Sequence, residues 1–178
     1  MQAGQTLIGL KSSGPHSNGY SLIRKVLELR DIVPDQGLLD QLMQPTRIYV
    51  KAILALLEEV NVSAMSHITG GGLLENLPRM FGNPSLEALI ELDSWETPEV
   101  FSWLQQAGNI SSVEMLKTFN CGLGFVACIP ANQTQRSLDL LSEQGEQAFV
   151  LGEVVTADTT TPTTSQLLLR SDASFAFG

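Results

Sequence analysis

Short apolar runs and amphipathic helical runs alternate along this chain, and this alternation restricts the possible folds more than any other feature. Strands are expected at residues 6–10, 62–68, 85–93, 123–129 and 148–155, where short apolar or loosely alternating runs are bounded by polar residues and glycines. The segments between these runs differ in length, which disfavours a regular parallel sheet built from βαβ units. The pattern predicts an α+β fold, a mixed β-sheet with helices packed on it.

Helical spacing of apolar residues is clearest at residues 49–60, where Ile53, Leu56 and Leu57 fall on one face. Ser111, followed three residues later by Glu114, is typical of a capping box at a helix start. Helices are expected at residues 19–29, 38–43, 49–60, 73–80, 98–108, 111–117 and 133–145.

The composition changes after residue 155. The chain has 178 residues, 43% of them hydrophobic, which is enough for one domain with a substantial core. Residues 156–164, TADTTTPTT, contain too little apolar material to pack. We therefore predict one domain over residues 1–155, with residues 156–178 forming a polar threonine-rich loop, a short edge strand at 166–171 and a frayed tail.

The charge balance and the cysteines exclude several classes of protein. Ten Lys and Arg against nineteen Asp and Glu give a net charge of -9, which disfavours nucleic-acid binding through a basic face. No apolar run is long enough for a membrane helix, and MQAGQTL does not resemble a signal peptide, so a cytoplasmic protein is expected. Cys121 and Cys128 are expected to be buried thiols, because their spacing fits neither a disulfide nor a zinc site.

Two polar loops stand out, and each contains one of the chain's two histidines. SHITGGGLL, residues 66–74, puts a glycine run between an expected strand and an expected helix, a setting in which free backbone N–H groups can meet an anion such as phosphate. The run does not match GxxxxGK[ST] or GxGxxG. An ordinary tight turn is the alternative.

The other loop, SSGPHSNGYSL at residues 12–22, is richer in polar groups than a turn requires. Ser17 or Asn18 could simply cap the following helix. His16 and His67 could be ligand donors, acid–base groups or loop-stabilising hydrogen bonders. The chain shows no local motif for a catalytic nucleophile and no acidic or histidine cluster with metal-ligand spacing, so no metal site is expected within it.

Four stretches together resemble a known family. GLKSSGPHSNGYSLIRKVL (9–27), PTRIYVK (45–51), SHITGGGLLENLPR (66–79) and KTFNCGLGF (117–125), in this order, are similar to the C-terminal domain of aminoimidazole ribonucleotide synthetase, also called phosphoribosylformylglycinamidine cyclo-ligase. The resemblance implies an ATP-dependent ring closure in purine biosynthesis. In that reaction a formyl oxygen of formylglycinamidine ribonucleotide is phosphorylated, an internal nitrogen attacks, and phosphate leaves.

The resemblance also implies a division of labour. In this family ATP and Mg²⁺ are held mainly by an N-terminal domain with a DGVGTK-like motif, which is absent from these residues, so the chain looks like half an enzyme. The implied partners are a phosphoribosyl substrate, the chain's own N-terminal domain and, for the full-length protein, a second copy. A non-catalytic binding module of the same fold, or half of a sister-family ATP-dependent enzyme, are the alternatives.

The candidate site residues lie in the two loops. His16 and His67 are the candidate catalytic residues. The candidate substrate- and phosphate-binding residues are Ser12, Ser13, Gly14, Ser17, Asn18, Gly19, Thr69, Gly70, Gly71 and Gly72.

Overall fold

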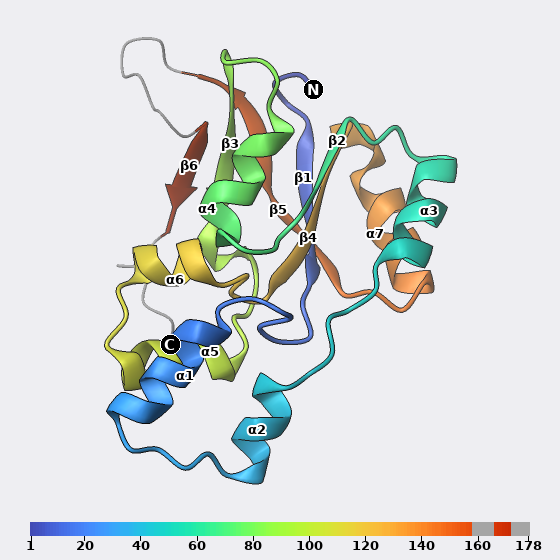
Figure 1. Cartoon of the computed structure of the whole chain (residues 1–178). Helices are drawn as coiled ribbons and strands as arrows, with labels where there is room; N and C mark the ends of the chain where they lie inside the picture. The colour runs from blue at the N-terminus through green and yellow to red at the C-terminus, as the bar shows by residue number, and fades with distance from the viewer. Residues whose placement is uncertain (158–165, 172–178) are drawn as a thin grey trace.

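A mixed sheet with the strand order β2-β4-β1-β5-β3-β6 is the frame of the structure, a computed structural model that describes residues 1–157 and 166–171 (Figure 1). All neighbouring strands are antiparallel except β3 and β6, which are parallel. The mixed sheet predicted from the sequence is therefore confirmed. The strands are β1 (Thr6–Lys11), β2 (Ala64–His67), β3 (Leu86–Glu91), β4 (Leu123–Ile129), β5 (Ala148–Thr156) and β6 (Leu167–Arg170).

Helices cover both faces of this sheet. Figure 1 shows α3 and α7 together on one side, and α1, α4, α5 and α6 on the other, with α2 at the lower edge. The helices are α1 (Tyr20–Leu29), α2 (Gln36–Leu42), α3 (Val50–Glu59), α4 (Gly72–Asn76), α5 (Glu99–Gly108), α6 (Ser112–Thr118) and α7 (Thr134–Glu143).

The strand β1 faces a hydrophobic core on each side. Leu7 belongs to the core under α1, α4, α5 and α6, whereas Ile8 and Leu10 belong to the core under α3 and α7. Successive side chains of a strand point to opposite faces, so a strand covered on both faces needs apolar residues at every position. This explains why β1 reads as a continuous apolar run.

Most predicted elements are present, with a few corrections. The predicted helix at 73–80 is not continuous, because α4 ends at Asn76 and a 3₁₀ turn, η1 (Leu77–Met80), follows it. Pro78 lies at the start of η1 and cannot donate the backbone hydrogen bond that would extend α4. Leu57, predicted on the buried face of its helix, is exposed.

The C-terminal segment is described only in part. The edge strand expected at residues 166–171 is confirmed by β6, which pairs with β3 at the end of the sheet. Most of the predicted threonine-rich loop and the predicted frayed tail lie outside the described residues, and the domain division at residue 155 stays a prediction. Both cysteines are buried and unpaired. None of the helices within 1–157 is long and apolar enough to cross a membrane.

Candidate functional site

The sheet topology brings three loops together at one end of the strands. Because β1 and β4 are antiparallel, the end of β1 at Lys11 lies opposite Leu123 at the start of β4, and His67 at the end of β2 lies opposite Phe125. The loops 12–19, 68–71 and 119–122 therefore lie at the same end of the sheet. The first two loops touch, since a Cβ atom added to Gly70 would lie 3.5 Å from Oδ1 of Asn18.

Four rings, those of His16, Tyr49, His67 and Phe125, form a cluster at this end of the sheet. The ring centroids of His16 and Tyr49 are 6.2 Å apart, those of His16 and His67 6.3 Å, and those of Tyr49 and His67 6.0 Å. Phe125 lies 5.6 Å from Tyr49 and 6.1 Å from His67. Each of the four sequence stretches singled out above contributes one ring, so residues far apart in the chain build one site.

His16 is buried in the cluster, with 3% of its surface exposed, as is Tyr49 with 4%. The backbone N–H of Ser13 donates to its Nε2 at 3.3 Å, which leaves the ring proton of the neutral imidazole on Nδ1. Nδ1 is buried and has no hydrogen-bond partner within the described part of the chain. Burial, and then the positive charges of His67 and Arg47, lower the pKa of His16 from 6.5 to about 4, so its ring is neutral at pH 7.

Tyr49 joins the cluster to the sheet. It precedes α3, and its hydroxyl donates to the carbonyl oxygen of Lys11 at 2.9 Å. Burial raises the pKa of Tyr49 well above its ordinary value, so the hydroxyl keeps its proton. Gly124 of β4 leaves the room for this arrangement: a Cβ atom there would overlap the Tyr49 hydroxyl and approach Cε1 of His16 to 2.9 Å.

His67 is the accessible member of the cluster. Its side chain is exposed at the end of the edge strand β2, on the same face as Tyr49 and Phe125. Partial burial against these rings lowers the pKa of His67, which favours the neutral imidazole. A molecule that enters from solvent can therefore reach His67 directly, whereas His16 lies beneath the surface.

Asn120 fixes the first loop to the third. The Ser12 hydroxyl donates to Oδ1 of Asn120 at 3.0 Å, and the backbone N–H of Gly122 donates to the same oxygen at 2.9 Å. The Asn120 amide donates in turn to the carbonyl oxygen of Gly14 at 2.9 Å. Asn120 is buried, so these bonds form in a dry environment where unmade hydrogen bonds are costly.

Asn76 holds the glycine loop in place. Its Nδ2 donates to the carbonyl oxygens of Thr69, Gly70 and Gly72 at 3.3, 3.1 and 2.8 Å. Its Oδ1 accepts from the Thr69 hydroxyl at 3.2 Å and from Nη1 of Arg79 at 3.1 Å. The loop carbonyls thus face inward onto one amide, and the exposed guanidinium of Arg79 brings a positive charge beside the glycines.

The glycine loop also carries a negative group. Gly71 has φ 94 and precedes the first residue of α4, and a Cβ atom there would meet the side chain of Glu75. The Glu75 carboxylate therefore lies over the loop, opposite in sign to Arg79. Anion binding at Gly71 requires this carboxylate to turn away or to be neutralised.

Some of the predicted site residues have side chains that already form hydrogen bonds within the protein, and others do not. The side-chain hydroxyls of Ser12, Ser13 and Thr69 bond to Asn120, to the carbonyl of Pro45 and to Asn76, and thereby shape the loops. The half-buried amide of Asn18 has no hydrogen-bond partner in residues 1–157 or 166–171.

The helix-cap explanation for Ser17 and Asn18 is wrong. Gly19, in a left-handed conformation, is the N-cap of α1, and no side chain caps it. The Ser17 hydroxyl instead pairs with that of Thr46 at 2.9 Å. Sequence reasoning did not assign Tyr49, Asn76, Arg79, Asn120 or Phe125 to the site, although all five lie in the four stretches, because nothing in their spacing shows which residues face the two loops.

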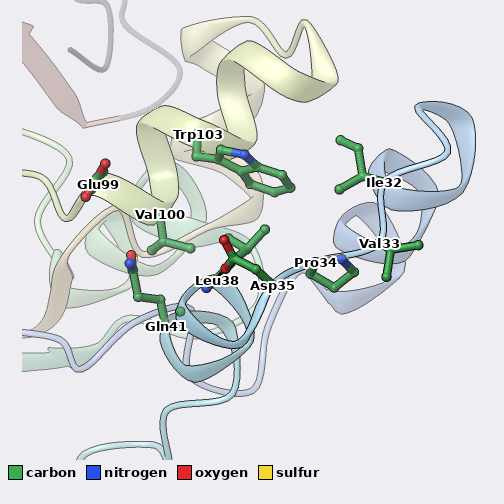
Figure 2. Close-up of a pocket in the computed structure, with 10 residues that line it drawn as sticks. Ile32, Val33, Pro34, Asp35, Leu38, Gln41, Glu99, Val100 and Trp103 are labelled. Carbon is green, nitrogen blue, oxygen red and sulfur yellow. Dashed lines mark hydrogen bonds between the residues drawn. The ribbon is translucent and has the colours of Figure 1, made fainter.

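Two cavities of about 430 Å³ each flank different parts of the fold. One, the aromatic cavity, lies beside the ring cluster and is lined by Arg47, Tyr49, His67 and Phe125 together with neighbouring residues of α3. The other, between α2 and α5, has Trp103 and Val100 on one side and Leu38 and Gln41 on the other (Figure 2). This second cavity contains none of the predicted site residues, and its charged groups are the carboxylates Asp35 and Glu99.

A metal has no evident place in this site. Nowhere in the described ranges do three His, Cys, Asp or Glu side chains gather in a way that would hold a metal ion. Mg²⁺ is usually held by only one or two carboxylates together with substrate phosphates, so this finding concerns a site built entirely from protein ligands.

Comparison with known families identifies the group to which this sheet and these loops belong. The family described as AIR synthase related protein, C-terminal domain, matches residues 2–164. The chain belongs to this family. The match covers all four stretches that build the ring cluster.

Solved structures of related fold come from several different proteins. Hydrogenase maturation protein HypE is similar with a TM-score of 0.66 and 15% identity over 96% of this chain and 50% of that one. Thiamine-monophosphate kinase from Stenotrophomonas maltophilia K279a gives 0.60 and 12%, over 94% and 50%. PurL of T. maritima, complexed with ADP, gives 0.52 and 16%, over 88% and 22%.

These similarities show the fold and do not by themselves distinguish among activities. The chain spans about half the length of the HypE and thiamine-monophosphate kinase structures. One HypE structure is in complex with ATP, and another is a HypE–HypF complex.

Proposed function

We propose that this chain is the substrate-side half of a phosphoribosylformylglycinamidine cyclo-ligase, which closes the imidazole ring of aminoimidazole ribonucleotide at the expense of ATP. The observation that carries the proposal is the convergence of the four motif stretches on one site, with one ring from each. If the four stretches served only to build the fold, they would not need to meet around one exposed site.

The reaction asks a protein for positioning and charge stabilisation. The formyl oxygen attacks the γ-phosphorus of ATP and ADP leaves. An internal nitrogen then bonds to the activated carbon and loses a proton, and the carbon–oxygen bond breaks to release phosphate. No protein nucleophile is required, which agrees with a site built from neutral imidazoles, amides and backbone groups.

Each part of the site has a role in this proposal. His67 and the free amide of Asn18 contact the substrate, because both are accessible and lie at the junction of the two loops. Gly70 and Gly71, beside Arg79, face the ribose phosphate or the transferring phosphoryl group once the Glu75 carboxylate has turned away or been neutralised. His16 lies behind them as a buried neutral ring that orients the cluster.

ATP and Mg²⁺ are assigned to another half of the protein. The HypE and kinase structures extend over about twice the length that this chain matches, which leaves room for such a half. The partner in this proposal is an ATP-binding N-terminal half, and the full-length protein is a homodimer. HypE in complex with ATP supports the use of ATP by proteins of this fold.

The decisive experiment measures ring closure. The chain is combined with a DGVGTK-bearing half, given formylglycinamidine ribonucleotide and ATP, and assayed for the aminoimidazole product by diazo coupling. We expect product from the combination and none from the chain alone. Phosphorylation of thiamine monophosphate instead would identify a sister-family enzyme, and ATP hydrolysis by this chain alone would contradict the division between the halves.

Calorimetric titration with formylglycinamidine ribonucleotide tests the site residues. We expect His67→Ala and Gly71→Val to weaken binding at least about tenfold, a loss near that of one charge-assisted hydrogen bond. Val113→Ala, an exposed change on α6, is the matched control. His67 is exposed, so its variant should fold even if Gly71→Val does not, and unchanged affinity in a folded His67→Ala protein would remove His67 from the site.

A further inference from the structure

The aromatic cavity has apolar walls that the fold leaves uncovered. Ile48, Val50 and Leu54 line it and are 80%, 63% and 56% exposed. Large apolar side chains this exposed are common one at a time, but three around one concave space are typical of a binding site. A volume of about 430 Å³ is within the range of small-molecule sites.

One wall of this cavity is aromatic. The rings of His67 and Phe125 are stacked, with 28° between their planes and centroids 6.1 Å apart. They come from directly paired positions of β2 and β4, so the sheet itself holds their faces in register. Tyr49 closes the inner end with its ring at a steep angle of 72° to His67. Such a surface favours a flat guest, because stacking gains most from a planar partner.

A fixed cation stands at the polar end of the cavity. Nε of Arg47 lies 2.7 Å from a carboxylate oxygen of Glu146, and its Nη2 donates to the carbonyl oxygen of Gly145 at 2.9 Å. Nη1 of Arg47 has no partner in the part of the chain that the structure describes. The guanidinium is therefore oriented by the protein and still has donors for an acceptor on a ligand.

We infer that the aromatic cavity binds a flat heteroaromatic ring that carries a hydrogen-bond acceptor, such as an unprotonated ring nitrogen. The ring lies along His67 and Phe125, Ile48, Val50 and Leu54 cover its other side, and the acceptor pairs with Nη1 of Arg47. The inference rests on the proposed function in placing the substrate loops beside His67. The same chemistry describes the newly closed imidazole of the product and the base of a purine nucleotide.

Methyl signals of the apolar wall are suitable reporters of ring binding. The chain, labelled at Ile, Leu and Val methyl groups, is titrated separately with aminoimidazole ribonucleotide, adenosine 5′-monophosphate and ribose 5-phosphate in a two-dimensional NMR experiment. We expect ring-bearing probes to shift the methyl signals of Ile48, Val50 and Leu54 through ring currents. Ribose 5-phosphate, which has no aromatic ring, should leave them in place.

Two substitutions separate the ring contact from the charge contact. Phe125→Leu keeps an apolar side chain and should weaken both ring-bearing probes about fivefold, the effect expected of one aromatic pair. Arg47→Gln should weaken those probes by about tenfold or more, and should weaken adenosine by the same factor, because the acceptor that pairs with Arg47 lies on the ring and not on the phosphate. Val113→Ala serves again as the control. The relative affinity of the two ring-bearing probes shows which source of the ring the cavity prefers.

The outcomes distinguish this inference from the proposed function. Shifts of the glycine-loop amides by ribose 5-phosphate, with no response of the cavity methyls to any ring, would overturn the inference and leave the proposed function standing. Cavity shifts with ring-bearing probes, in a chain whose combination with an ATP-binding half makes no product, would support the cavity and count against the cyclo-ligase. Methyl signals that move only when the other half is added would assign the cavity to that half and overturn the inference.

Discussion

Acidification should destabilise the folded chain through His16. In the unfolded chain this histidine takes up a proton near pH 6.5, whereas in the folded chain its pKa is about 4. Between these two values the unfolded state binds more protons, so the free energy of unfolding falls as the pH falls. At 1.36 kcal/mol for each pKa unit, the full loss from His16 is about 3 kcal/mol.

The matched variant is His16→Asn. His16 has φ 58, a left-handed conformation that asparagine tolerates better than most residues, so the exchange removes the ionisable ring without new backbone strain. Urea unfolding followed by far-ultraviolet circular dichroism at pH 7, 6, 5 and 4 gives the free energy of unfolding of both proteins. The acidic residues titrate in both proteins, so their contribution cancels in the comparison.

We expect the wild-type chain to lose about 3 kcal/mol more than the variant over this range, with most of the difference appearing between pH 6.5 and pH 4. His67→Asn should change the slope much less, because His67 is exposed. Parallel pH profiles for the wild type and His16→Asn would refute the reasoning, since they would mean that His16 is protonated as easily in the folded chain as in the unfolded one.

Three further predictions concern groups that the site depends on. Asn76→Ala leaves three loop carbonyls without their donor and should lower the free energy of unfolding by about 2–4 kcal/mol, measured in urea; a midpoint equal to that of the wild type would contradict this. Gly124→Ala should displace the Tyr49 hydroxyl and cost about 1–3 kcal/mol, visible as a lower melting temperature. Burial raises the pKa of Cys121 and raises that of Cys128 to about 11. Neither thiol should therefore react with a disulfide reagent at pH 8 until urea unfolds the chain. Rapid labelling of the native chain would contradict this, because it would show that the thiols are accessible.

The sequence predicts the elements of this fold well because its local signals agree with one another. The apolar run of β1, the helical spacing of α3 and the Ser111 cap of α6 each indicate the element that forms. The helix predicted at residues 73–80 is wrong at its end because of a single residue: Pro78 converts that end into a 3₁₀ turn. Strand order is a different matter, because the pairing of β4 between β1 and β2 depends on contacts over more than fifty residues of chain.

The site was only half predictable for the same reason. The two loops were identified from their histidines and glycines, which are unusual locally. The residues that hold the loops in place, Asn76 and Asn120, are ordinary amides in sequence, and they gain importance only from the carbonyls that the fold places around them. The two loops have similar compositions, so the sequence could not show that His16 is buried and His67 is exposed.

The position of β4 decides which parts of the site can move. Gly124 and Phe125 belong to a strand with a partner on each side, and that strand contributes side chains to the cores on both faces of the sheet. Amide protons on β4 should therefore exchange with solvent only when the whole domain unfolds, whereas those of the loops above it can exchange by local opening. The loops, and any partner that closes over them, must therefore supply the movement that accommodates a ligand, while Gly124 and Phe125 of β4 stay fixed.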